Sequence, residues 1–180
     1  MKQLYEWLFL WVVRLVHALY RIEGVNACLL IAPAKLVPVI LRRYGAAVGE
    51  DVEIHSPLII HNAKASYANL RIGNQCYIGR EVFFDLKEPI TLEDRVTLSM
   101  RVSLLTHLDV GHAQVKAYLP SSQAPIRIRC DSYLGAGTLV LAGVTIGECA
   151  AIGAGSVVCE SVGDRELHAG DPAKKIRDLR

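Results

Sequence analysis

The sequence predicts a mainly β fold, built from short strands that stack into a solenoid. Apolar residues return at every sixth position, and a second apolar or small residue often comes four positions later. A period of six fits neither a helix nor an isolated strand, but it fits short strands joined by tight corners. Stacked coils of this kind bury a core that no single repeat could bury alone. The in-phase residues are Val48, Ile54, Ile60, Ile72, Ile78, Phe84, Leu92, Leu98, Leu104, Ile128, Leu134, Val140, Ile146, Ile152 and Val158.

Composition and charge exclude several classes of protein. The 180 residues are enough for one domain with a sizeable core, and 52% apolar with 21% charged residues excludes a disordered chain. A net charge of +2 gives no indication of nucleic-acid binding, so we expect no nucleic-acid partner. The five cysteines form no CxxC pair. We therefore expect neither a disulfide framework nor a zinc site, and we expect a reduced, cytoplasmic protein.

The last third of the chain carries a family resemblance. "YLGAGTLVLAGVTIGECAAIGAGSVV", followed by "HAGDPAKKIRDLR", resembles the hexapeptide-repeat acyltransferases, in their sugar and polysaccharide O-acetyltransferase branch. The match covers residues 48–180. It implies a left-handed parallel β-helix with three hexads per coil, acetyl-CoA as co-substrate, and a homotrimer with sites between subunits. Tyr133 and Ala142 stand where the family usually has Trp and Pro, and "GDREL" replaces a proline-rich segment. We expect these departures to change packing more than chemistry.

Residues 1–44 are expected to form an apolar helical segment. The stretch from residue 4 to residue 20 is apolar on nearly every face, but it is too short and too interrupted for a membrane span and a poor fit to a signal peptide. Pro33 and Pro38 limit regular helix farther on.

Two interpretations of this segment stay open. It could cap the open end of the coil stack and pack between subunits. It could instead lie in a membrane interface, at the inner face of the cytoplasmic membrane, which would suit an acceptor carried on a lipid. The head-group residues would then be Trp7, Trp11, Arg14, Arg42 and Arg43.

The coil stack, residues 45–163, is interrupted once by a loop insertion at residues 107–124. Between Leu104 and Ile128 the core pattern stops, and prolines and serines take its place. An excursion this long from a compact repeat is usually functional or disordered. The resemblance implies that this loop carries or adjoins the catalytic histidine.

Two histidines in the insertion are candidates for that residue. His107, in "LLTH", is the first candidate for a general base, and His112 is the second, with acceptor binding as its alternative role. Imidazole titrates near neutral pH, so it suits removal of a proton from an attacking hydroxyl. A carboxylate or a backbone carbonyl has to hold the other ring nitrogen, and Asp109 is close enough in sequence to serve.

The resemblance also implies a donor site. Ala136 and Ala154 would contact the pantetheine arm of coenzyme A, and Cys159 stands where the family often has Thr. Residues 164–180 form a basic tail. Its cations would hold the nucleotide phosphates, and they are Lys174, Lys175 and Arg177. An acyl-cysteine route through Cys159 or Cys149 is disfavoured, because nothing near either thiol marks an activated thiolate.

The sequence therefore predicts an acetyltransferase that moves an acetyl group from acetyl-CoA to a hydroxyl of a saccharide or polysaccharide precursor. N-acetylation with the same base stays possible, and no metal is expected. One alternative is a metal-dependent hydratase of the γ-carbonic-anhydrase type, which uses the spacing of His107 and His112 but needs a third histidine that "NLRIGNQCYIGR" lacks. Another is a non-catalytic β-helix scaffold. The acceptor stays open, and so do the places of Asp85 and Asn74, two residues that could select it.

Overall fold

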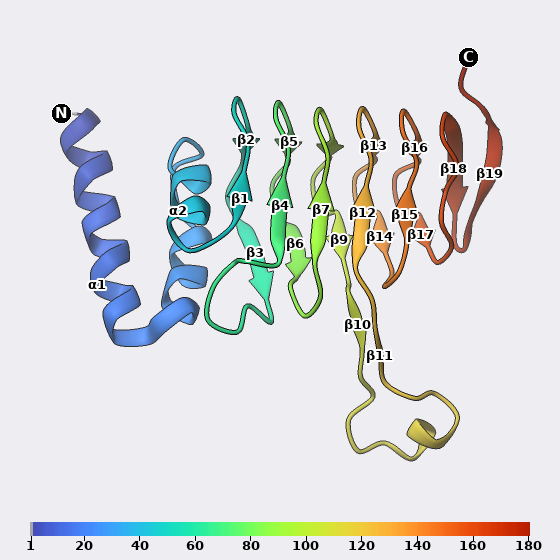
Figure 1. Cartoon of the computed structure of the whole chain (residues 1–180), viewed down its shortest axis with the longest axis horizontal. Coiled ribbons are helices and arrows are strands. Elements are labelled where there is room, and N and C mark those ends of the chain that lie inside the picture. The colour runs from blue at the N-terminus through green and yellow to red at the C-terminus, as the bar shows by residue number, and fades with distance from the viewer. Residues whose placement is uncertain (1) are drawn as a thin grey trace.

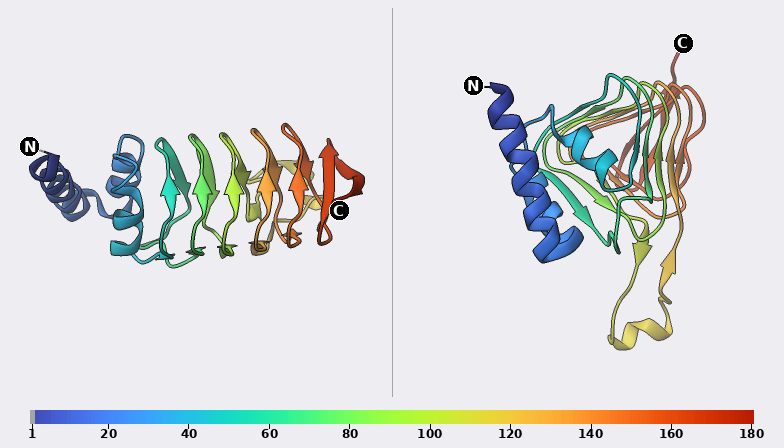
Figure 2. Two further views of the ribbon diagram at one scale, coloured as in Figure 1. Left: turned by 90° about the horizontal axis from the view of Figure 1, so that it is seen from above. Right: turned by 60° about the vertical axis from the view of Figure 1, so that its left-hand side comes forward.

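The computed structural model describes residues 2–180 as a helical part, a three-sided β-helix and a projecting arm (Figures 1 and 2). The helical part consists of α1 (Lys2–Leu29) and α2 (Val37–Arg43). Helix α1 bends at Arg21, whose φ is 55° and ψ is −146°. Gly24 makes the bend possible, because a Cβ there would lie 2.6 Å from Cγ1 of Val16. The bend divides α1 into an outer segment, residues 2–20, and an inner segment, residues 22–29.

The inner segment and α2 close the N-terminal end of the β-helix (Figure 1). Pro38 sits in the first turn of α2, where its missing N–H costs no hydrogen bond. The hydroxyl of Ser56 donates to the carbonyls of Leu29 and Ala32, which ties the inner segment to the first coil. The fully buried apolar residues of this cap are Val25, Leu29, Val37, Ile40 and Leu41.

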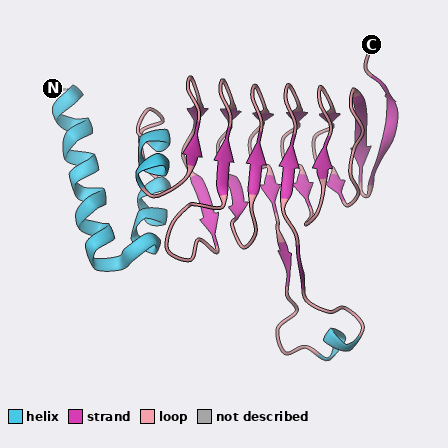
Figure 3. Cartoon of the chain, viewed as in Figure 1, coloured by secondary structure: helices cyan, strands magenta, loops and turns pink. Residues whose placement is uncertain are grey.

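Three parallel sheets form the faces of the β-helix, drawn as strands in Figure 3. Face A contains β1 (Ala47–Val48), β4 (Leu70–Ile72), β7 (Ile90–Leu92), β12 (Ile126–Ile128) and β15 (Thr145–Ile146). Face B contains β2 (Glu53–Ile54), β5 (Tyr77–Ile78), β8 (Thr97–Leu98), β13 (Tyr133–Leu134) and β16 (Ala151–Ile152), followed by the C-terminal strands β18 (Glu166–Gly170) and β19 (Ala173–Asp178). Face C contains β3 (Leu58–His61), β6 (Val82–Asp85), β9 (Ser103–Leu104), β14 (Leu139–Val140) and β17 (Val157–Val158).

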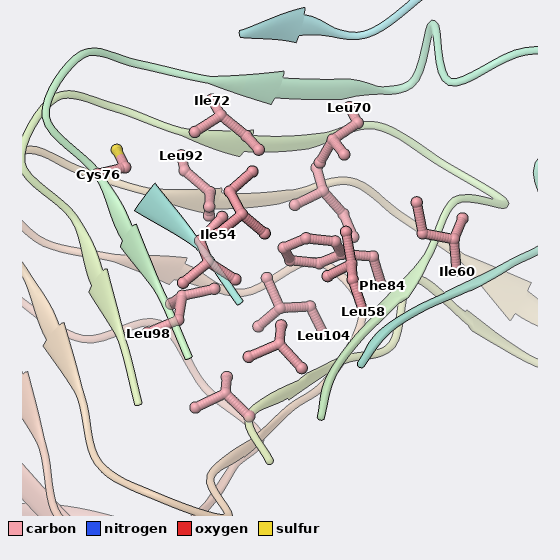
Figure 4. Close-up of a cluster of buried hydrophobic side chains, with 14 of the residues drawn as sticks. Ile54, Leu58, Ile60, Leu70, Ile72, Cys76, Phe84, Leu92, Leu98 and Leu104 are labelled. Atoms are coloured by element: carbon pink, nitrogen blue, oxygen red, sulfur yellow. The ribbon is translucent and has the colours of Figure 1, made fainter. Parts of the chain in front are cut away.

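The predicted hexad residues form the core columns of these faces. On face B, Ile78 pairs with Leu98, which pairs with Leu134, so residues of equal phase lie one above another. Figure 4 shows the inward side chains of several coils meeting in one cluster. All the in-phase residues are buried except Val48, which is half-buried at the capped end. The predicted β-helix fold is confirmed.

The insertion forms the arm, which projects away from the three-sided prism of the β-helix (Figure 2). Strands β10 (His107–Leu108) and β11 (Ser122–Gln123) pair antiparallel at its base, and a short 3₁₀ helix, η1 (Gln114–Ala117), lies at its tip. The arm leaves the stack between β9 on face C and β12 on face A.

The C-terminal residues differ from the expected basic tail. Strand β18 pairs parallel with β16 and so continues face B, and β19 turns back antiparallel along β18. The segment has no hexad pattern because β19 adds only one small side chain, Ala173, to the core. Its strands form by backbone pairing on the open edge of β16.

Candidate active site

Asp85 and His107 form the central contact of the site. Asp85 ends β6, and His107 starts the arm one coil farther along the stack. Oδ2 of Asp85 lies 2.5 Å from Nδ1 of His107. The Asp85 side chain is 1% exposed, whereas that of His107 is 29% exposed. One end of the pair is thus buried in the prism, and the imidazole reaches solvent.

Two further residues fix the Asp85 carboxylate. Nδ2 of Asn62 donates to Oδ1 at 2.7 Å, and the backbone N–H of Thr106 donates to Oδ2 at 2.9 Å. Burial by itself raises the pKa of Asp85, but the hydrogen bonds from His107, Asn62 and Thr106 outweigh it and leave the pKa below its ordinary value. The carboxylate therefore stays ionised at neutral pH and accepts a hydrogen bond from Nδ1–H of His107.

A cavity of about 410 Å³ opens beside the imidazole. Because Nδ1 is bound to Asp85, Nε2 is the nitrogen left to accept a proton from a bound group. A buried carboxylate, an oriented imidazole and an adjoining polar cavity together make a site for general-base chemistry. The lining residues are Asn62, Lys87, His107, Leu108, Asp109, Ser121, Ser122 and Gln123.

The structure corrects the expected role of Asp109. Its Oδ1 accepts hydrogen bonds from the backbone N–H of Gly111 and the hydroxyl of Ser121, and it does not hold the His107 ring. Asp109 still lines the cavity, but its contacts stabilise the arm. His112 lies exposed farther out on the arm and is not among the residues that line the cavity.

The predicted donor residues are divided between two edges of face C. Ala136 and Ala154 stack at the corner between faces B and C, where the N–H of Gly155 donates to the carbonyl of Ala136. Cys159 follows β17 and lies at the opposite edge, between faces C and A, which is also the edge from which the arm leaves. A face with its corners spans about five residues, or roughly 15 Å. One chain therefore does not bring Ala136 and Ala154 to His107.

The predicted phosphate-binding cations lie on β19. Ala169 packs against Gly153 and is paired with Lys174, so Lys174 lies near the corner that holds Ala154. Lys175 contacts Glu166 at 2.7 Å and Asp178 at 2.8 Å. These carboxylates raise the pKa of Lys175, with Asp178 the larger cause. Arg177 lines a second cavity, of about 520 Å³, together with Asp178 and Arg180.

Sequence reasoning missed most of the support of the imidazole. Asp85 and His107 are 22 residues apart, and only the stacking of coils brings them together. Asn62 follows β3, and only the pairing of β3 with β6 shows that it lies beside Asp85. Within residues 2–180, no three side chains of the His, Cys, Asp or Glu type are placed so as to hold a metal ion.

Comparisons with known proteins bear on the fold of the chain. No family model matches the chain. It is 26% identical over 141 residues to the galactoside O-acetyltransferase of Escherichia coli K12, which covers 78% of this chain and 67% of that protein. It is 32% identical over 111 residues to an acetyltransferase of Schizosaccharomyces pombe, which covers 62% of this chain and 54% of that protein.

Solved structures show the same fold. A hexapeptide-repeat acetyltransferase of Vibrio cholerae superposes with a TM-score of 0.77 at 22% identity, covering 93% of each chain. A galactoside acetyltransferase in complex with coenzyme A also gives 0.77 at 22% identity, covering 88% of this chain and 78% of that one. A maltose O-acetyltransferase of Clostridium difficile gives 0.75 at 21% identity, covering 88% and 84%. The fold that the resemblance implied is confirmed. The chain spans about half to two thirds of the length of the two curated relatives.

Proposed function

We propose that this chain, a hexapeptide-repeat β-helix protein similar to sugar acetyltransferases, transfers an acetyl group from acetyl-CoA to a hydroxyl of a saccharide. The observation that carries the proposal is the Asp85–His107 pair beside the polar cavity. The relatives supply the substrate class, because they include a galactoside and a maltose O-acetyltransferase and a structure with coenzyme A.

The pair supplies the proton transfer that the reaction needs. Nε2 of His107 takes the proton of the acceptor hydroxyl as its oxygen attacks the thioester carbonyl. Asp85 holds Nδ1–H and stabilises the imidazolium that forms. The tetrahedral intermediate then collapses, the carbon–sulfur bond breaks, and the imidazolium protonates the departing thiolate. The products are the acetyl ester and coenzyme A, and the ring returns to its starting state.

The division of the site across face C supports a homotrimer. His107 lies at one edge of the face and the Ala136–Ala154 corner at the other, so a neighbouring copy would have to complete the site. The outward side chains of face C are largely apolar, which suits burial against a second chain. They are Ile59, Phe83, Ser103, Leu139 and Val157, whereas face A presents Ala47, Arg71, Thr91, Arg127 and Thr145.

The proposed contacts to acetyl-CoA follow the corner that holds Ala136 and Ala154, which is called the donor corner below. Ala136 and Ala154 have small side chains, so a thin pantetheine arm can lie along their corner. Lys174 lies near the C-terminal end of that corner, and Arg177 lies farther along β19, opposite Leu167. The five cysteines of the chain are free thiols, which suits the reducing cytoplasm.

The test is a thiol-release assay with acetyl-CoA and a panel of mono- and oligosaccharides, with the ester product identified by mass spectrometry. The proposal expects turnover with at least one acceptor and protection of the protein against thermal unfolding by coenzyme A. Absence of both acetyl-CoA binding and turnover across the panel would count against an acetyltransferase and in favour of a scaffold.

A further inference from the structure

The outer segment of α1 carries a broad apolar stripe that no other segment of residues 2–180 covers. Nine large apolar side chains between residues 4 and 20 are each 40–68% exposed. At 100° per residue, eight of them gather on one side of the helix over an arc of roughly 160°, and Tyr20 lies about 60° beyond it. The exposed residues are Leu4, Tyr5, Trp7, Leu8, Trp11, Val12, Leu15, Leu19 and Tyr20.

The opposite side of the outer segment holds it to the cap. Val13 is 1% exposed, and the ring of His17 lies 4.7 Å from the ring of Tyr44, centroid to centroid. Figures 1 and 2 show the outer segment at the N-terminal extremity of the molecule, with α2 between it and the first coil. The stripe therefore faces away from the β-helix, because the other face of the helix makes the intramolecular contacts.

Two arginines flank this stripe on its tryptophan side. Arg14 and Arg43 line a cavity of about 220 Å³ together with Trp7, Leu10 and Trp11. The same two arginines line a neighbouring cavity of about 370 Å³ with His17 and Tyr44. No acidic side chain lines either cavity, and in residues 2–180 neither arginine makes an ion pair.

We propose that the outer segment of α1 lies flat in the interface of an anionic lipid bilayer, with the apolar stripe among the acyl chains and Arg14 and Arg43 on lipid phosphates. Residues 4–20 are about 25 Å long, and Trp and Tyr rings prefer this boundary. No helix in the described part of the chain is long and apolar enough to cross a membrane, so the segment would rest on the surface.

The charges favour a bilayer over a second copy of the chain. A twofold contact through the stripe would place the same patch against itself, so Arg14 and Arg43 would face their own counterparts without a carboxylate. An anionic membrane surface supplies the missing countercharge, and each arginine near it contributes about 1 kcal/mol. This inference does not depend on the proposed reaction, because it concerns the opposite end of the molecule from the donor corner.

The experiment is flotation of the full-length protein with vesicles, read together with tryptophan fluorescence. The chain has two tryptophans, Trp7 and Trp11, so the emission reports on the outer segment alone. The protein should bind phosphatidylcholine vesicles that contain roughly one-third phosphatidylglycerol, and its emission should shift to the blue. High salt should release the protein from these vesicles. Vesicles of phosphatidylcholine alone should bind it at least tenfold more weakly.

Two sets of variants locate the contact. Arg14→Gln with Arg43→Gln should weaken binding by about 30-fold, which corresponds to the two charges. Leu8→Gln with Leu15→Gln should abolish the blue shift. Arg71→Gln changes an exposed arginine on face A, outside both helices, and should bind like the wild type. Circular dichroism should show that each variant keeps its fold. Binding that ignores both pairs, or self-association through α1 without vesicle binding, would overturn the proposal.

Discussion

The carboxylate of Asp85 and the imidazole of His107 belong to adjacent coils, and their 2.5 Å contact joins the buried interior of the prism to the base of the arm. The register of face C makes this contact. Phe84 lies directly beneath Leu104, so the residues that follow each of them come together at one edge.

His107→Ala should lower kcat by about two to four orders of magnitude, because removal of a general base typically costs that much. The affinity for coenzyme A should stay nearly unchanged, since the donor corner lies across face C. Steady-state kinetics and calorimetric titration with coenzyme A measure the two effects. His112→Ala is the matched control, and we expect a smaller loss that falls mainly on the acceptor KM. Full wild-type activity in both variants would remove the arm from the chemistry.

Asp85→Asn should reduce kcat by roughly two or more orders of magnitude while His107 stays in place. An amide at this position donates a hydrogen bond to Nδ1, so the ring carries its proton on Nε2, the nitrogen that has to accept one. Asp85 is thus a positioning residue, and its variant should also shift the pH profile of kcat/KM. Asp109→Asn serves for comparison, because Asp109 does not touch the ring. A larger loss from Asp109→Asn would reverse the assignment.

Asp85 should also make folding stability depend on pH on the acid side. Its pKa in the folded protein is lowered, so the unfolded chain binds its proton at a higher pH than the folded protein does. The stabilisation is complete above the ordinary pKa of an aspartate and is lost as the pH falls through the lowered folded value. Urea unfolding at a series of pH values should show a shallower acid-side slope for Asp85→Asn than for the wild type. Parallel slopes would show that the carboxylate is not held in its ionised form.

Lys174→Ala combined with Arg177→Ala should raise the KM for acetyl-CoA by about tenfold with little change in kcat, as expected for lost contacts to phosphate. Lys175→Ala alone should have a smaller effect, because Glu166 and Asp178 already hold that ammonium group. Lys64→Gln, an exposed cation at the other end of the stack, is the control. Donor kinetics at low salt measure all of them, and an unchanged KM in the double variant would show that β19 does not bind the phosphates.

Mixing two inactive variants tests whether each site is shared between chains. His107→Ala lacks the base, and Ala154→Trp blocks the donor corner. If neighbouring chains complete each other's sites, refolding the two variants together at equal amounts should restore about one quarter of wild-type activity. Sites contained within single chains would stay inactive in the mixture, so the activity of the mixture separates the two arrangements. Analytical ultracentrifugation of the same samples gives the oligomeric state.

The stack could be predicted from the sequence because each coil buries its side chains by a rule that repeats. Ile78, Leu98 and Leu134 are 20 and 36 residues apart, yet one inward position per hexad determines that they share a column. The strands of the tail could not be seen in this way, because β19 contributes backbone pairing and mostly exposed side chains, with Ala173 alone packed against the core.

One residue of the Asp85–His107 pair could be found from the sequence, and the other could not. His107 stands out because it lies where the hexad pattern stops. Its partner needed the coil-to-coil register, since Asp109 is nearer in sequence but Asp85 is nearer in space. One signal was present: at the position after the in-phase residue of face C, coils carry His61, Asp85, Leu105, Leu141 and Cys159, and Asp85 is the carboxylate among them.

The stacked columns also determine how the molecule comes apart. In a solenoid each coil is held chiefly by its neighbours, so opening proceeds coil by coil from a free end. The cap protects the first coils, and the hydrogen-bonded set of Asn62, Asp85 and Thr106 ties those coils together. Fraying therefore starts at β19 and advances toward the middle. A molecule opened at β19 would lose the proposed phosphate contacts of Lys174 and Arg177, while Asp85 and His107 would still contact each other.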